Sequence, residues 1–158
     1  MKRLILLVVA ALFASVGYAQ TVKFTVPDVE VKVKRCICSG DTAYIDLVVT
    51  NWRGNELEAT ILESEPMGGY SNFYTAAHDD EGNAYRYKEN LSITFSGVGW
   101  PFCKLPAEVP VKFRVYIKNL SKYASEFSLL KVAFRGISQT EPYGAALLEI
   151  RNIPITRQ

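Results

Sequence analysis

The stretch VKFRVYIK, residues 111–118, alternates strictly between two kinds of side chain. Every odd-numbered residue in it is apolar, and every even-numbered residue carries a charge or a hydroxyl group. Successive side chains of a β-strand point to opposite faces of the sheet. The pattern therefore predicts a strand with one face in the core and the other face toward water.

The same period of two recurs along most of the chain. Segments 29–38 and 42–50, separated by the turn signal Ser39-Gly40-Asp41, predict a β-hairpin. No window of 12 residues has a helical stripe, although 120–128 has room for one helical turn. Segments rich in glycine and proline predict loops, and the longest of these is 96–110. Further segments with an extended pattern lie at 22–26, 57–61, 71–78, 84–88, 91–95, 130–134 and 146–150.

This spacing of short strands predicts an all-β fold. Because each sheet has one apolar face, two sheets must pack these faces together. We expect an antiparallel immunoglobulin-like β-sandwich of about eight or nine strands.

The first nineteen residues have the layout of a cleavable signal peptide. Lys2 and Arg3 precede an apolar run, and small residues, including Gly17 and Ala19, precede a cleavage position before Gln20. The run is too short for a spanning helix, which needs about 20 apolar residues. We therefore expect a secreted or periplasmic protein with no stable membrane insertion after processing, and a single domain over 20–158.

Processing also changes the charge. The full chain has 18 Lys and Arg against 16 Asp and Glu, and residues 1–19 hold two of the bases and no acid. The mature chain is therefore neutral, which argues against nucleic acid as a partner. Between Lys104 and Arg135 the bases outnumber the acids, and we interpret this bias as a solvated face.

Three segments of the chain share a pattern of strand ends and turns: YIDLVVTNWRG at 44–54, HDDEGNAY at 78–85 and LPAEVPVKF at 105–113. Together they resemble a family of small bacterial exported immunoglobulin-like domains of unknown function. The resemblance spans about residues 22–152. It implies a sandwich at the cell surface or in the periplasm, and it carries no catalytic residue onto this chain.

The chain has three cysteines, an odd number for an oxidising compartment. Cys36 and Cys38 lie two apart on a predicted strand, so their Cβ atoms stand about 7 Å apart, too far for an unstrained bridge. We predict a disulfide of Cys103 with Cys36 or Cys38. A metal site built from these cysteines needs a fourth ligand such as His78, and we expect no metal and no cofactor.

The direction in which Cys36 and Cys38 point is left open by the pattern. If Val29, Val31 and Val33 face the core, strict alternation sends both cysteines outward, under the 96–110 loop. A β-bulge near residues 34–35 reverses the direction of every later side chain and sends them inward.

One histidine and several acids are candidates for catalysis. His78 lies beside the acidic turn 79–83 and is a candidate base for a nucleophile. The alternative function is therefore a small secreted hydrolase that uses either His78 or a carboxylate pair. No nucleophile motif accompanies it. The acidic turn has oxygen ligands for Ca²⁺, but a hairpin turn accounts for the same residues.

Aromatic residues in predicted loops favour binding over catalysis. Trp52, Trp100 and Phe102 lie outside the predicted strands, where rings serve a ligand more often than on core strands. The rival role for Trp100 is a plug over the end of the sandwich. We therefore predict a non-catalytic binding or accessory module that engages a protein or glycan partner at the cell envelope.

Overall fold

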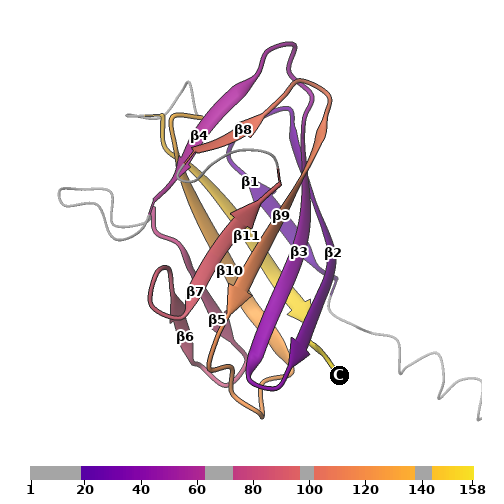
Figure 1. Ribbon diagram of the computed structural model, residues 1–158, viewed down its shortest axis with the longest axis vertical. Helices are drawn as coiled ribbons and strands as arrows, with labels where there is room; N and C mark the ends of the chain where they lie inside the picture. The colour runs from indigo at the N-terminus through magenta and orange to yellow at the C-terminus, as the bar shows by residue number, and fades with distance from the viewer. Residues whose placement is uncertain (1–18, 63–72, 97–101, 138–143) are drawn as a thin grey trace, which may run out of the picture.

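The computed structural model describes residues 19–62, 73–96, 102–137 and 144–158. These residues form two β-sheets packed face to face around one apolar core (Figure 1). The predicted all-β sandwich is therefore confirmed. The predicted signal peptide lies outside the described residues, apart from Ala19.

The described residues form twelve strands, more than the eight or nine expected. One sheet has five strands in the order β12-β2-β3-β9-β7. The other has seven: β1-β11-β10-β4-β8 in order, with β5 also pairing β10, and β6 pairing β5. All pairs are antiparallel except β12 with β2. The bounds are β1 Thr21–Phe24, β2 Val29–Ser39, β3 Thr42–Asn51, β4 Leu57–Ile61, β5 Ala76–Asp79, β6 Ala84–Arg86, β7 Leu91–Phe95, β8 Phe102–Leu105, β9 Pro110–Ile117, β10 Glu126–Arg135, β11 Ala146–Pro154 and β12 Thr156–Arg157.

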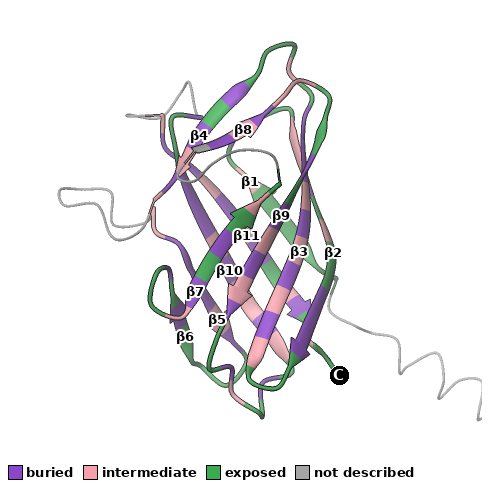
Figure 2. Cartoon of the chain, in the orientation of Figure 1, coloured by how far each residue is buried: buried purple, intermediate pink, exposed green. Residues whose placement is uncertain are grey.

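Alternation places the core as the sequence predicts. Along β9 the odd-numbered residues 111–117 are buried, and Figure 2 shows alternate buried and partly exposed positions on β3 and β9. The odd-numbered residues 43–49 of β3 and the even-numbered residues 130–134 of β10 are buried as well. Burial of these apolar side chains from both sheets is the main force that holds the two layers together.

A β-bulge decides the direction of the two cysteines in β2. Val33 pairs with Leu47 and Arg35 with Asp46, so Lys34 is an extra residue opposite β3. This shift turns Cys36 and Cys38 into the core, where they are 4% and 1% exposed. Of the two alternatives left open by the pattern, the bulge is the one found.

Three elements differ from the expectation. The predicted loop 96–110 contains β8, which pairs with β4 through Leu57 opposite Leu105. The segment 120–128 forms turns followed by the start of β10, and the described residues contain no α-helix. The parallel strand β12, opposite Ile37 and Cys38, was not predicted because two residues are too few for a periodic signal.

Candidate functional site

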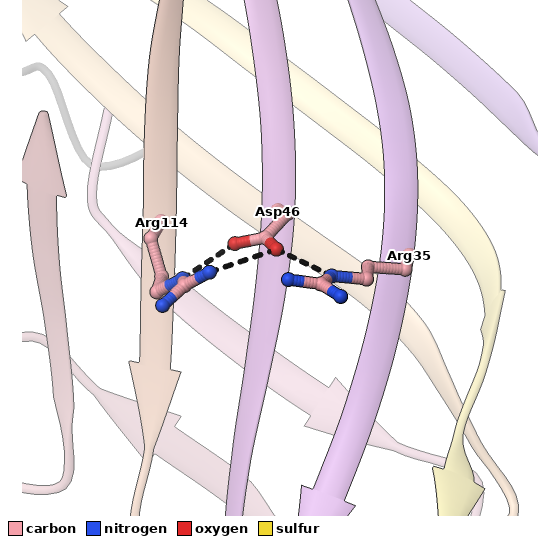
Figure 3. Close-up of polar contacts among 3 residues, drawn as sticks. All are labelled: Arg35, Asp46 and Arg114. Carbon is pink, nitrogen blue, oxygen red and sulfur yellow. Dashed lines mark hydrogen bonds and ion pairs between the residues drawn. The ribbon is translucent and has the colours of Figure 1, made fainter. Parts of the chain in front are cut away.

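A cluster of charged side chains lies on the outward face of the five-stranded sheet. Asp46 in the middle strand β3 stands between Arg114 of β9 and Arg35 of β2 (Figure 3). Arg114 donates to both carboxylate oxygens of Asp46, Nε to Oδ1 at 2.5 Å and Nη2 to Oδ2 at 2.9 Å. Arg35 Nε donates to Oδ2 at 2.7 Å. One carboxylate therefore fixes two guanidinium groups across three neighbouring strands.

The contacts within this cluster favour the charged forms of Asp46 and Arg114. The hydrogen bonds from Arg114, and then those from Arg35, hold the pKa of Asp46 below its usual value, although partial burial opposes them. The pKa of Arg114 is raised, first by Asp46 and then by a hydrogen bond with the Tyr116 side chain. Asp46 and Arg114 are therefore both charged at neutral pH.

Two tyrosines hold the position of Arg114 more firmly. Its guanidinium carbon lies 5.0 Å from the ring centroid of Tyr44 and 5.9 Å from that of Tyr116, within the range of a cation–π contact. Tyr44 and Tyr116 are directly opposite each other in the β3–β9 register. The ion pair and the rings together restrict the rotamers that Arg114 can adopt.

Two lysines complete a positively charged depression in this face. Lys34, the bulged residue, and Lys112, two residues before Arg114, line the depression together with the Arg35–Asp46–Arg114 cluster. Neither lysine side chain makes an ion pair with another described residue. Four bases and one acid are the charged residues that line the depression, a local net charge of +3. We call Lys34, Arg35, Asp46, Lys112 and Arg114 the basic face.

The basic face was not identified from the sequence. The pattern of 111–118 placed Lys112 and Arg114 toward water, but it gave no register between β9 and β3 or β2. Only the bulge at Lys34 and the pairing of Asp46 with both neighbours bring charges from positions 34–35 and 112–114 together.

Of the three aromatic residues predicted to bind a partner, two lie among the described residues. Trp52 follows β3 and is 56% exposed. Its backbone N–H donates to Asp28 O at 2.7 Å, and its side chain hydrogen-bonds to Glu30. Trp100 lies outside the described residues, and Phe102 begins β8, opposite Thr60 of β4.

His78 and the acidic turn are placed in the seven-stranded sheet. His78 is a half-buried residue of β5, opposite Leu129 of β10 and Ala84 of β6. The carboxylate of Asp79 accepts hydrogen bonds from the backbone of Glu81 and Asn83 and is 3% exposed. These bonds make the acidic segment a hairpin turn. Within the described ranges, no group of three His, Cys, Asp or Glu residues is arranged to hold a metal ion.

All three cysteines are buried free thiols, so the disulfide of Cys103 with Cys36 or Cys38 is not found in the structure. Cys103 lies in β8, near one end of the sandwich, whereas Cys36 and Cys38 lie near the other end, where β2 finishes (Figure 1). A disulfide needs Cα atoms less than about 7 Å apart. The Cys38 thiol instead donates to Gly40 O at 3.3 Å and accepts from Arg157 Nη1 at 3.5 Å.

We expect the native protein to resist thiol reagents. Burial raises the pKa of Cys36 and that of Cys103 to about 12, so few thiolates form near pH 8. Titration with a chromogenic disulfide reagent should find no fast-reacting thiol in the native state and three thiols per chain after denaturation without reductant. One thiol per chain in the denatured protein would show that two of the three cysteines are bridged, contrary to the structure.

Comparisons with known proteins give no family assignment. No family model and no curated protein matches the chain. The resemblance to bacterial exported domains therefore has no support from a sequence match and stays a prediction. Among solved structures, the ASH / PapD-like domain of human CEP192 (PapD-like domain 7) is similar at 12% identity, with a TM-score of 0.40. The match covers 84% of this chain and 85% of that chain, and at this TM-score it carries no functional inference.

Among the described residues, no helix has the length and apolar character needed to cross a membrane.

Proposed function

We propose that this chain is a non-catalytic, exported binding module. After removal of residues 1–19, it engages a protein or glycan partner at the cell envelope through the basic face. The observation that carries the proposal is a net charge of +3 held in one depression on a solvent-exposed sheet, whereas residues 20–158 as a whole hold equal numbers of acidic and basic residues. A local excess of one sign selects partners of the opposite sign and speeds their encounter.

The arrangement of the basic face favours binding because its central part is already ordered. Asp46 and the two tyrosines hold Arg114, and Asp46 holds Arg35, before any partner arrives. Side chains that are fixed in advance lose less entropy on binding. The two lysines add charge that no described residue neutralises, and this charge remains available to an acidic group on the partner.

The test is charge reversal of the two lysines, K34E/K112E, which leaves the Arg35–Asp46–Arg114 contacts in place. We expect the variant to fold like the wild type and to capture at least about tenfold less of the principal ligand from an envelope extract, since two attractive contacts become repulsive. Retention would be quantified on immobilised protein comprising residues 20–158.

The matched control is K23E/K122E, which changes the net charge by the same amount outside the basic face. Lys23 lies in β1 of the seven-stranded sheet, and Lys122 lies in the turn before β10. Equal capture by the wild type and K34E/K112E would refute the proposed function. Equal loss in both double variants would mean that net charge, and not this face, governs retention.

A further inference from the structure

The spacing of the cations on the basic face matches that of an extended peptide. Lys112 and Arg114 lie two residues apart on the same face of β9, so their Cα atoms are separated by about 7 Å. Side chains at alternate positions of any extended chain repeat at the same distance. A peptide with acidic residues at alternate positions can therefore place one carboxylate against each cation.

Lys112 and Arg114 on β9 form one row of cations, and Lys34 and Arg35 on β2 form a second row on the other side of β3. Asp46 of β3 lies opposite both Arg35 and Arg114, and the bulge places Lys34 next to Arg35. Two strand spacings separate the rows, about 10 Å. An extended chain that lies over β3 is therefore flanked by cations on both sides.

The alternation of an extended chain directs its acids to one face. Successive side chains point to opposite faces, so acidic residues at alternate positions all point toward the basic face, and the residues between them point away from it. Val48, a half-buried residue on the outward face of β3 opposite Lys112, lies beneath such a peptide.

We propose, on the basis of the proposed function, that the partner presents an extended peptide segment with acidic residues at alternate positions, and that this segment lies over β3 between the two rows of cations. Its carboxylates pair chiefly with Lys34 and Lys112. The residues between the acids point away from the sheet. The basic face selects this segment by charge complementarity and by the common two-residue repeat.

The experiment uses a defined probe, the acetylated and amidated heptapeptide EVEVEVE, in isothermal titration calorimetry with residues 20–158. At about 10 mM salt the Debye length is about 30 Å, so charges in contact are little screened, and we expect saturable binding. Binding should weaken several-fold at about 150 mM salt. The uncharged peptide QVQVQVQ should bind at least about tenfold more weakly, because it keeps the apolar repeat and lacks the carboxylates.

The variants are neutralisations that keep side-chain length. K34Q/K112Q should weaken binding of EVEVEVE about tenfold, two exposed ion pairs each contributing up to about fivefold. K23Q/K122Q, which removes the same charge elsewhere, should stay within about twofold of the wild type. Equal weakening by both pairs would overturn the inference, since it would show only general attraction of an anion.

Polygalacturonate is the competing probe. If it binds in a manner that depends on Lys34 and Lys112 while EVEVEVE does not bind, the partner is an acidic glycan and the peptide inference is wrong, although the proposed function stands. If neither probe binds but K34E/K112E still loses the captured ligand, the inference again fails and the proposed function survives. If K34E/K112E captures as much ligand as the wild type, both the proposed function and the peptide inference are refuted.

Discussion

Replacement of Asp79 by alanine is expected to lower the free energy of unfolding by about 3 kcal/mol. Tyr85 donates its hydroxyl hydrogen to Asp79 Oδ2 at 2.7 Å in the interior, and Asn83 donates from its backbone N to Oδ1 at 2.8 Å and from Nδ2 to Oδ2 at 2.9 Å. Alanine removes these acceptors. A buried group left without its partner costs about 1–3 kcal/mol, and bonds to a charged acceptor are among the stronger ones.

The effect should extend beyond the turn. Tyr85 also accepts a hydrogen bond from Ser121 N at 3.2 Å and packs edge-on against Phe127, with ring centroids 6.1 Å apart. Loss of Asp79 therefore loosens contacts between the β5–β6 hairpin and the segment that leads into β10. For a domain of this size we expect the melting temperature to fall by about 10 °C.

The control for Asp79 is Glu81→Ala in the same turn. The side chain of Glu81 is exposed, and its substitution should change the free energy of unfolding by less than about 0.5 kcal/mol. Chemical denaturation of the two variants gives both values. Equal stability of Asp79→Ala and the wild type would contradict a structural role for this carboxylate. Stabilisation of the wild type by Ca²⁺, absent in Asp79→Ala, would instead make the turn an ion site.

Replacement of Asn51 by alanine is expected to cost about 3 kcal/mol as well, by weakening a junction between the two sheets. Asn51 ends β3 and is 0% exposed. Its Nδ2 donates to Leu105 O of β8 at 3.0 Å and to Asn55 O at 2.8 Å, and its Oδ1 accepts from Arg53 N at 3.0 Å. Alanine leaves the Leu105 carbonyl without this donor and opens a small cavity beside it.

Asn55→Ala is the matched control, because it makes the same chemical change four residues away. Asn55 is exposed, and the carbonyl that accepts from Asn51 belongs to its backbone and is retained. Its melting temperature should stay within a few degrees of the wild type, whereas that of Asn51→Ala should fall by about 10 °C. If both variants lose the same stability, the loop 51–55 matters as a whole and the Asn51 junction does not.

Asn51→Asp separates the hydrogen bonds from the cavity. Aspartate has nearly the same volume, but its carboxylate lacks the amide donor and faces two carbonyl oxygens. Burial and these oxygens should raise its pKa, so protonation should favour the folded state. We expect the stability deficit of Asn51→Asp relative to the wild type to be larger at pH 7 than near pH 4, where a protonated carboxyl group can donate again.

Much of the fold was predictable because it depends on local pattern. The alternation in 42–50 and 111–118 assigns each side chain to a face, since the strand period is fixed by the backbone itself. The same reasoning identified the hairpin of β2 and β3, and the inward positions of β4, β10 and β11. It failed for β8, where four residues among prolines and glycines are too short to show a period, and for β12.

The candidate site was predictable only in part. Loop position identified Trp52 as an exposed ring, and it remains one. The basic face was not predicted because its bases belong to two segments that are nearly 80 residues apart. Each segment alone is an ordinary solvated strand face. The predicted disulfide of Cys103 with Cys36 or Cys38 is not found, for the related reason that spacing along the chain does not give distance across the sandwich.

The sequence by itself determined that this chain forms strands, which side chains of most strands face the core, and where the hairpin of β2 and β3 turns. The tertiary structure alone decided the bulge at Lys34, the burial of Cys36 and Cys38 as free thiols, and the position of Asp46 between two arginines. The physical reason is that side-chain direction is set by each strand's own backbone. Register and neighbours are set by the packing of the whole core, which no local segment encodes.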